Sequence, residues 1–284
     1  MLDCGMARRL CFTVAAALLA APAFVTPAHA QAYLPEDNLA YPVQLIVPGG
    51  GGTGFFVRRD RELFLVTARH VLFDMATGQL HSREFTLRAL SKDLKEAAVT
   101  VMHVNAGQLE EARQIRADDR RDVAVIRLGT LRPERFDTTP GVVVGERSRG
   151  GIIVAPFDYL TRYANVDISS QIFMFGYPSV GVSGFSQIDG SRPLVRSGIV
   201  AGLNAALKTI IIDAPVNHGN SGGPVVQLSR TNKLRIIGIA TQFVPVPEDV
   251  VGVKPGDSTM VALGNSGYGV VASADAIIEL IEAF

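Results

Sequence analysis

Short runs of apolar and polar residues recur along most of the chain, separated by Gly, Pro, Asn and Asp. The runs are rich in Val, Ile, Phe and Thr, the residues that favour strands. They read YPVQLIV, GTGFFV, LFLVTA, AVTVMHV, DVAVIRL, GIIVAP, QIFMFGY, LVRSGIV, TIIID, GPVVQL, LRIIGIATQFV and YGVVA. Strands at this spacing, with little helical periodicity between them, predict an all-β barrel or sandwich.

One helix is predicted, in the last run, ADAIIELIEAF. Ser273 stands before it as an N-cap. Four apolar residues fall near one face at helical spacing: Ile277, Ile278, Ile281 and Phe284. The polar segments 74–96 and 105–121 predict surface loops, and the irregular region 132–149 predicts the boundary between two halves.

The first thirty residues have the pattern of a secretory signal peptide. A basic start at Arg8 and Arg9 precedes an apolar run over 10–25, and the small residues Ala28 and Ala30 follow. The pattern predicts cleavage after Ala30. An uncleaved membrane anchor is disfavoured, because the run is short for a bilayer span and contains proline and many alanines.

The positions of the cysteines and the net charge indicate the cellular compartment and the kinds of partner that the chain can bind. Both cysteines, Cys4 and Cys11, lie in the leader, so the mature chain is expected to have no disulfide. Export without disulfides indicates a bacterial periplasmic or secreted protein. The 27 Lys and Arg residues balance 27 Asp and Glu residues, which gives no support to a nucleic acid or an anionic membrane as partner. No later run is long enough to span a bilayer.

The pattern also predicts neither a metal nor another cofactor. No group of His, Asp or Glu has the spacing of metal ligands. The glycine run at 49–52 lacks the lysine and the following helix of a phosphate-binding loop, so it indicates a turn into a strand.

The segment DAPVNHGNSGGPVV, residues 213–226, places Ser221 among three glycines and before Pro224. Glycines allow a tight backbone bend and leave space beside the hydroxyl, as an exposed nucleophile requires. The same letters also suit an ordinary turn, and locally the two interpretations are about equal. The rest of the chain decides between them.

A serine nucleophile needs a base, and the chain offers His70 at the end of the strand-like run FLVTARH. Of the other histidines outside the leader, His81 falls in a loop and His103 in a strand pattern. His218 lies too close to Ser221 to reach back around the turn. The base needs a carboxylate to fix its tautomer. Asp122 stands directly before the apolar run 123–126 and is preferred over the two loop aspartates before it.

The order His70, Asp122, Ser221 excludes two other classes of serine hydrolase. Residues 219–223 also fit the G-x-S-x-G pattern of the α/β-hydrolases, but no histidine follows Ser221, as that class requires. The subtilisin order needs the acid before the histidine and a helix-rich parallel sheet, neither of which fits a β-rich chain.

The chain resembles a trypsin-like serine protease of the chymotrypsin fold, and most closely the bacterial high-temperature-requirement peptidases. The matching pieces are GTGFFV, FLVTARHVL, DVAVIRL, SGIVAGL, DAPVNHGNSGGPVV, RIIGIATQ and YGVVASADAIIELI, in the family's order. The resemblance implies two packed six-stranded antiparallel β-barrels with a C-terminal helix. It places the first barrel, with His70 and Asp122, over 31–145, and the second, with Ser221, over 146–284.

The resemblance also implies how the site acts on protein or peptide substrates. The N–H groups of Gly219 and Ser221 would form an oxyanion hole, and Thr241 falls where the family has a hydroxyl bonded to the catalytic acid. Pro215 stands where an acid in trypsin selects lysine or arginine, so a small apolar pocket is expected. The expected pocket residues are Pro215, Val216, His218, Ala240, Thr241 and Phe243.

Some features depart from that family. Arg69 precedes His70 where two small residues are usual, so its side chain must find solvent or a carboxylate. The peptide-binding PDZ domain common in the closest relatives is not expected after the final helix. A serine endopeptidase is therefore predicted, with two alternatives: a catalytically inactive pseudoprotease that binds peptides, or a serine hydrolase that acts on esters.

Overall fold

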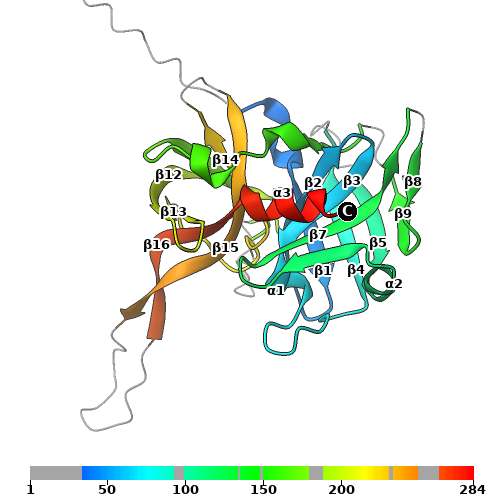
Figure 1. Ribbon diagram of the computed structural model, residues 1–284, viewed down its shortest axis with the longest axis horizontal. Helices are drawn as coiled ribbons and strands as arrows, with labels where there is room; N and C mark the ends of the chain where they lie inside the picture. Colours follow the sequence, from blue (N-terminus) through cyan, green and yellow to red (C-terminus); the bar gives the residue numbers. More distant parts are fainter. Residues whose placement is uncertain are drawn as a thin grey trace, which may run out of the picture. The chain divides into compact units, whose positions relative to one another are not determined.

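The computed structural model describes residues 34–92, 99–133, 135–147, 150–178, 188–229, 233–248 and 262–284. Leu34–Phe284 form one compact unit, shown in Figure 1. The leader expected over residues 1–30 lies outside the described residues, so its cleavage stays a prediction. None of the helices in the described ranges has the length and apolar character needed to cross a bilayer.

The N-terminal half is a curled antiparallel sheet with the order β6-β7-β3-β2-β1-β4-β5-β9, to which β8 adds beside β7 and β10 beside β2. Its central strand β3 is buried from Leu63 to Ala68, because β2 and β7 flank it and apolar side chains cover both faces. The strands are β1 (Pro42–Val47), β2 (Gly50–Arg59), β3 (Glu62–Ala68), β4 (Glu84–Leu90), β5 (Val99–Asn105), β6 (Ile115–Asp118), β7 (Val123–Leu131), β8 (Phe136–Thr138), β9 (Val142–Glu146) and β10 (Ala155–Pro156).

The C-terminal half is a closed six-stranded barrel with the order β11-β12-β13-β16-β15-β14. Alternate residues point inward, and Ile172, Met174 and Ile210 are fully buried in its core. The pairing of β14 with β15 shifts register beside Gly238, where a Cβ would lie 2.0 Å from the carbonyl oxygen of Ala272. The strands are β11 (Gln171–Gly176), β12 (Leu194–Asn204), β13 (Thr209–Asp213), β14 (Pro224–Leu228), β15 (Leu234–Glu248) and β16 (Ala262–Ser273).

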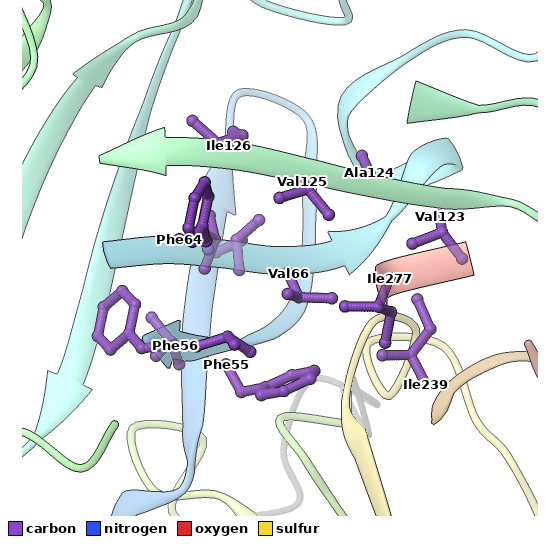
Figure 2. Packing of buried hydrophobic residues seen from close by; sticks show 14 of the residues in the cluster. Phe55, Phe56, Phe64, Val66, Val123, Ala124, Val125, Ile126, Ile239 and Ile277 are labelled. Carbon is purple, nitrogen blue, oxygen red and sulfur yellow. The ribbon is translucent and has the colours of Figure 1, made fainter. Parts of the chain in front are cut away.

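The helices are short, and the longest follows the last strand. The α-helices are α1 (Arg69–Leu72), α2 (Ala106–Glu111) and α3 (Ala274–Glu282), and the 3-10 helices are η1 (Glu36–Ala40), η2 (Phe157–Tyr159) and η3 (Tyr163–Asn165). Helix α3, red in Figure 1, packs beside β7 of the N-terminal sheet. Figure 2 shows Ile277 of α3 pointing toward Val66 and Ile239. The chain's last helix therefore completes the core of the first sheet.

The expected all-β class is confirmed, with one closed barrel, one curled sheet and a C-terminal helix. Among the described residues the N-terminal sheet has ten strands rather than six, and two of the short ones, β8 and β10, pair beside β7 and β2, off the main strand order. The segments expected as surface loops also contain β4, α2 and β6. The boundary at 145 stays a prediction, since β10 lies beyond it and still pairs with β2.

Ser273 occupies the N-cap position of α3, as expected, but its side chain makes no capping hydrogen bond. Its hydroxyl is buried and has no hydrogen-bond partner among the described residues. In the first turn of α3, the carboxylate of Asp275 accepts a hydrogen bond from the backbone N–H of Tyr163 at 2.5 Å. The helix start is therefore held by packing rather than by the predicted cap.

Candidate active site

Strand pairing brings His70 and Asp122 together. Ala68 at the end of β3 pairs with Val123 at the start of β7, so the residues just beyond these ends face each other. The N–H of Arg69 donates to the carbonyl of Asp122 at 3.1 Å. The N–H of His70 donates to Asp122 Oδ1 at 2.9 Å, and His70 Nδ1 lies 2.6 Å from Asp122 Oδ2. The carboxylate thus holds both the backbone and the ring of His70.

Asp122 is fixed by its backbone as well as by its contacts. Its φ is +56°, the left-handed region in which Asp and Asn are the commonest non-glycine residues. The Asp122 side chain is 10% exposed, whereas the His70 side chain is 32% exposed. Because a carboxylate only accepts, the proton of neutral His70 lies on Nδ1, and Nε2 is left as an acceptor.

The turn before Asp122 is ordered by a second aspartate. Asp118 Oδ1 accepts the N–H groups of Arg120 and Arg121, and its Oδ2 lies 2.7 Å from Arg121 Nε. Burial opposes the ionisation of Asp118, but the hydrogen bonds and charge of Arg121 outweigh it and lower the pKa of this carboxyl. Arg121 also pairs with Glu279 of α3 at 2.5 Å. Asp118 is therefore a structural residue and not the free loop charge that its sequence context indicates.

Ser221 lies in a loop of two consecutive turns, here called the serine loop, residues 217–223. The N–H of Asn220 donates to the carbonyl of Asn217 at 3.0 Å, and that of Gly223 to the carbonyl of Asn220 at 2.9 Å. Asn220 is buried, and its Oδ1 accepts the N–H of Asn217 at 3.2 Å. The sequence alone gave this asparagine no role.

Two glycines of the HGNSGG segment, Gly219 and Gly222, are required by conformation, and Gly222 also by space. Gly219 has a φ of +86° and Gly222 a φ of +85°, in the region that side chains disfavour. A Cβ on Gly222 would lie 2.0 Å from the carbonyl oxygen of Thr53. The glycines thus let the serine loop pack directly on strand β2.

Two backbone N–H groups near Ser221 donate no hydrogen bond within the described residues. Its Oγ donates to the carbonyl of Thr241 at 3.3 Å and not to His70. Within the described part of the chain, the N–H groups of Gly219 and Ser221 donate to no acceptor. Unpaired neighbouring N–H groups beside a serine are suited to bind an anionic or partly charged oxygen.

The expected pocket residues lie at different depths in the C-terminal barrel. Val216 and Ala240 are buried in the barrel core, whereas Pro215 and Phe243 are half-buried. His218 is exposed, and its ring meets Phe243 edge-on with 6.3 Å between centroids. Their role in binding substrate stays a prediction.

One side chain does not make the contact that the family resemblance implied. Thr241 Oγ1 donates to the carbonyl of Val270 at 3.3 Å and does not contact Asp122. This expectation is wrong because the hydroxyl faces the neighbouring strand β16. Arg69, expected to reach solvent or a carboxylate, pairs with no carboxylate among the described residues. Its guanidinium lies over the ring of Phe73 and contacts the sulfur of Met75 at 3.0 Å in an exposed position.

No set of three or more His, Cys, Asp or Glu side chains in the described ranges is arranged to hold a metal ion. The site is built from backbone groups, one histidine, one carboxylate and one hydroxyl. It is therefore suited to proton transfer and nucleophilic attack by its own side chains.

Solved structures similar to the chain include an HtrA-type protease. The HtrA-type protease AlgW with a tripeptide matches over 86% of this chain, with 18% identity and a TM-score of 0.48. Deg5 matches over 72% of this chain and 81% of its own, with 19% identity and a TM-score of 0.45. An inactive form of Rv3671c from M. tuberculosis matches over 86% of both chains, with 15% identity and a TM-score of 0.45. This chain spans 60% of the length of the AlgW chain.

No curated protein is significantly similar to the chain in sequence. The family model of the trypsin-like peptidase domain matches residues 52–239, which is more than half of the chain. The matched region contains His70, Asp122 and Ser221. The chain therefore belongs to the trypsin-like peptidase family.

Proposed function

We propose that the chain is an exported serine endopeptidase in which Ser221 is the nucleophile, His70 the base and Asp122 the residue that orients the base. The observation that carries the proposal is the 2.6 Å contact between His70 Nδ1 and Asp122 Oδ2. This contact keeps the ring proton on Nδ1, so Nε2 is available to accept the proton of a serine hydroxyl.

The reaction starts with rotation of the Ser221 hydroxyl away from the carbonyl of Thr241 and toward His70 Nε2. Oγ then attacks the carbonyl carbon of a peptide bond while Nε2 takes its proton. The new C–O bond moves one electron pair onto the carbonyl oxygen, which becomes the oxyanion. Asp122 stabilises the imidazolium that has formed.

Collapse of this intermediate breaks the C–N bond, and His70 gives its proton to the leaving amine. An acyl group remains on Ser221. A water molecule attacks it, with His70 again taking a proton, and the acid product leaves with Oγ reprotonated. Each cycle consumes one water and restores the protein.

The oxyanion is bound, in this proposal, by the N–H groups of Gly219 and Ser221. Their lack of acceptors within the described residues supports this role, because a donor already paired would have to break a bond first. The positive φ of Gly219 supports it further, since a side chain would hinder that conformation.

Labelling with a fluorophosphonate–rhodamine probe tests the nucleophile, and hydrolysis of labelled casein tests the reaction. Ser221→Ala and His70→Ala should each abolish both signals while the protein stays folded. Full casein hydrolysis by folded Ser221→Ala would disprove the assignment.

The bond from Ser221 Oγ to the Thr241 carbonyl favours a second candidate, a peptide-binding protein that does not cleave. In that case the hydroxyl stays on Thr241, the probe does not react, and peptides bind without turnover. Labelling of the unaltered protein at Ser221 together with casein hydrolysis would exclude it. Labelling and ester hydrolysis without casein hydrolysis would instead indicate an esterase.

A further inference from the structure

Thr53 on β2 connects the N-terminal sheet to the serine loop through two direct hydrogen bonds. Its N–H donates to the carbonyl of Ser221 at 2.9 Å. Its Oγ1 donates to the carbonyl of Gly219 at 2.6 Å. Gly219 is 166 residues away in the chain, and Thr53 is fully buried. A single residue of the first sheet thus holds both residues proposed to supply the oxyanion donors.

The direction of the Thr53 hydroxyl proton is fixed by its partners. Oγ1 lies 2.9 Å from the N–H of Tyr177, which can only donate. The carbonyl of Gly219 can only accept, so the one hydroxyl proton must point to it. The β-branched side chain has few rotamers. The carbonyl of Thr53 is held in turn by Thr67 Oγ1 at 2.7 Å.

This arrangement fixes the peptide unit between Gly219 and Asn220 at both ends. Its carbonyl oxygen accepts from Thr53, and its N–H donates to Asn217 at 3.0 Å. A peptide unit is planar, so two anchored ends leave it one orientation. The N–H of Gly219 lies across the Cα of Gly219, two rotatable bonds away, one of them at the positive φ, and its direction therefore depends on this unit.

The space around Thr53 is adapted to this contact. A Cβ on Gly52 would lie 3.1 Å from the carbonyl oxygen of Ser221, and one on Gly54 would lie 2.6 Å from that of Val66. Glycine on both sides lets the serine loop and β3 approach the backbone of β2. The only side chain in this G-T-G segment is the one that bonds to Gly219.

We propose that Thr53 is a positioning residue for the oxyanion hole: its hydroxyl orients Gly219 so that the N–H of Gly219 faces the reacting carbonyl. The proposal rests on the proposed serine peptidase mechanism. Thr53 touches no substrate in this scheme and acts through Gly219. Its loss should therefore lower the rate of the chemical step more than the binding of the substrate or probe.

The experiment measures the labelling kinetics of the fluorophosphonate–rhodamine probe at several concentrations, which separates the maximal rate from the half-saturating concentration. Ser221 Oγ forms a bond to phosphorus, fluoride leaves with the P–F electron pair, His70 takes the hydroxyl proton, and the phosphoryl oxygen occupies the oxyanion hole. Thr53→Val removes the hydroxyl at nearly constant shape. Thr53→Ala leaves room for a water and gives a second variant if valine prevents folding.

Two further variants make the result specific. Thr53→Ser keeps the hydroxyl and should retain a near-normal rate. Thr67→Val removes a second hydroxyl that is as buried as that of Thr53 and that donates to the backbone carbonyl of Thr53. This variant therefore serves as a control for the folding stability lost when a buried hydroxyl is removed. Thermal unfolding of each variant shows whether it is folded at the assay temperature.

We expect Thr53→Val and Thr53→Ala to lower the maximal labelling rate by about 10- to 100-fold, with little change in half-saturation. This is less than the roughly 10²- to 10³-fold loss caused by removing an oxyanion donor itself. A normal rate in either folded variant, an equal loss in Thr67→Val, or no rescue by Thr53→Ser would overturn the role of Thr53. Undiminished labelling of Ser221→Ala would instead overturn the proposed function, whatever the Thr53 variants do.

Discussion

Replacing Asp122 by Asn tests the orientation of His70 with little change in shape. Asn tolerates the left-handed backbone that Asp122 adopts, and its Oδ1 can keep the N–H of His70. The other carboxylate oxygen, 2.6 Å from His70 Nδ1, is replaced by an NH₂ group that only donates. The ring must then accept at Nδ1 and carry its proton on Nε2, where it cannot receive the serine proton.

The expected loss of turnover for Asp122→Asn is about 10⁴-fold at neutral pH, the effect of the wrong tautomer in such a triad. It corresponds to about 5 kcal/mol in the activation barrier. The assay is casein hydrolysis beside thermal unfolding, which should change little. Asp119→Asn is the matched control, because Asp119 is an exposed neighbour in the same turn. A folded Asp122→Asn protein with near-normal turnover would refute the role of Asp122.

Four other outcomes are expected. The exported protein should begin at Gln31 and contain no thiol, which an intact mass tests; a retained leader cysteine would contradict it. A peptide library should show cleavage after small or medium apolar residues, and a dominant preference for lysine or arginine would disprove the predicted pocket. Gly222→Ala should greatly reduce labelling of the serine, because its Cβ would lie 2.0 Å from the carbonyl of Thr53, whereas Gly202→Ala, with open space around it, should behave normally. The lowered pKa of Asp118 stabilises the folded state above the ordinary Asp pKa, and this contribution should be lost as pH falls through the lowered value; acid unfolding of Asp118→Asn should lack this step.

The parts of the site closest to recognisable local patterns could be predicted from the sequence. His70 and Asp122 each adjoin an apolar run, and their approach follows from pairing of the two strands at Ala68 and Val123. The positive φ of Gly219 follows equally from the local turn chemistry. The β-rich class follows from the strand spacing and the final helix from the helical apolar pattern, whereas the closed barrel was implied only by the family resemblance.

Contacts that depend on distant packing could not be predicted in this way. The bond from Thr53 to Gly219 spans 166 residues, and a lone threonine in a strand gives no local sign of it. Asp118 has the sequence context of a free loop charge, but Arg121 and the turn bury it in part. Thr241 was assigned a contact from family resemblance, and the direction of its hydroxyl toward Val270 depends on the pairing of two strands.

The position of α3 has a consequence for the order in which the protein can fold during synthesis. Ile277 lies in the core of the N-terminal sheet, and the ring of Phe284 packs on Phe64 at 5.3 Å between centroids. The residues of the N-terminal sheet are synthesised first, so this sheet lacks part of its core until α3 has been synthesised. Contacts between such distant segments form late, and apolar side chains around Phe64 stay open to water or to chaperones until then.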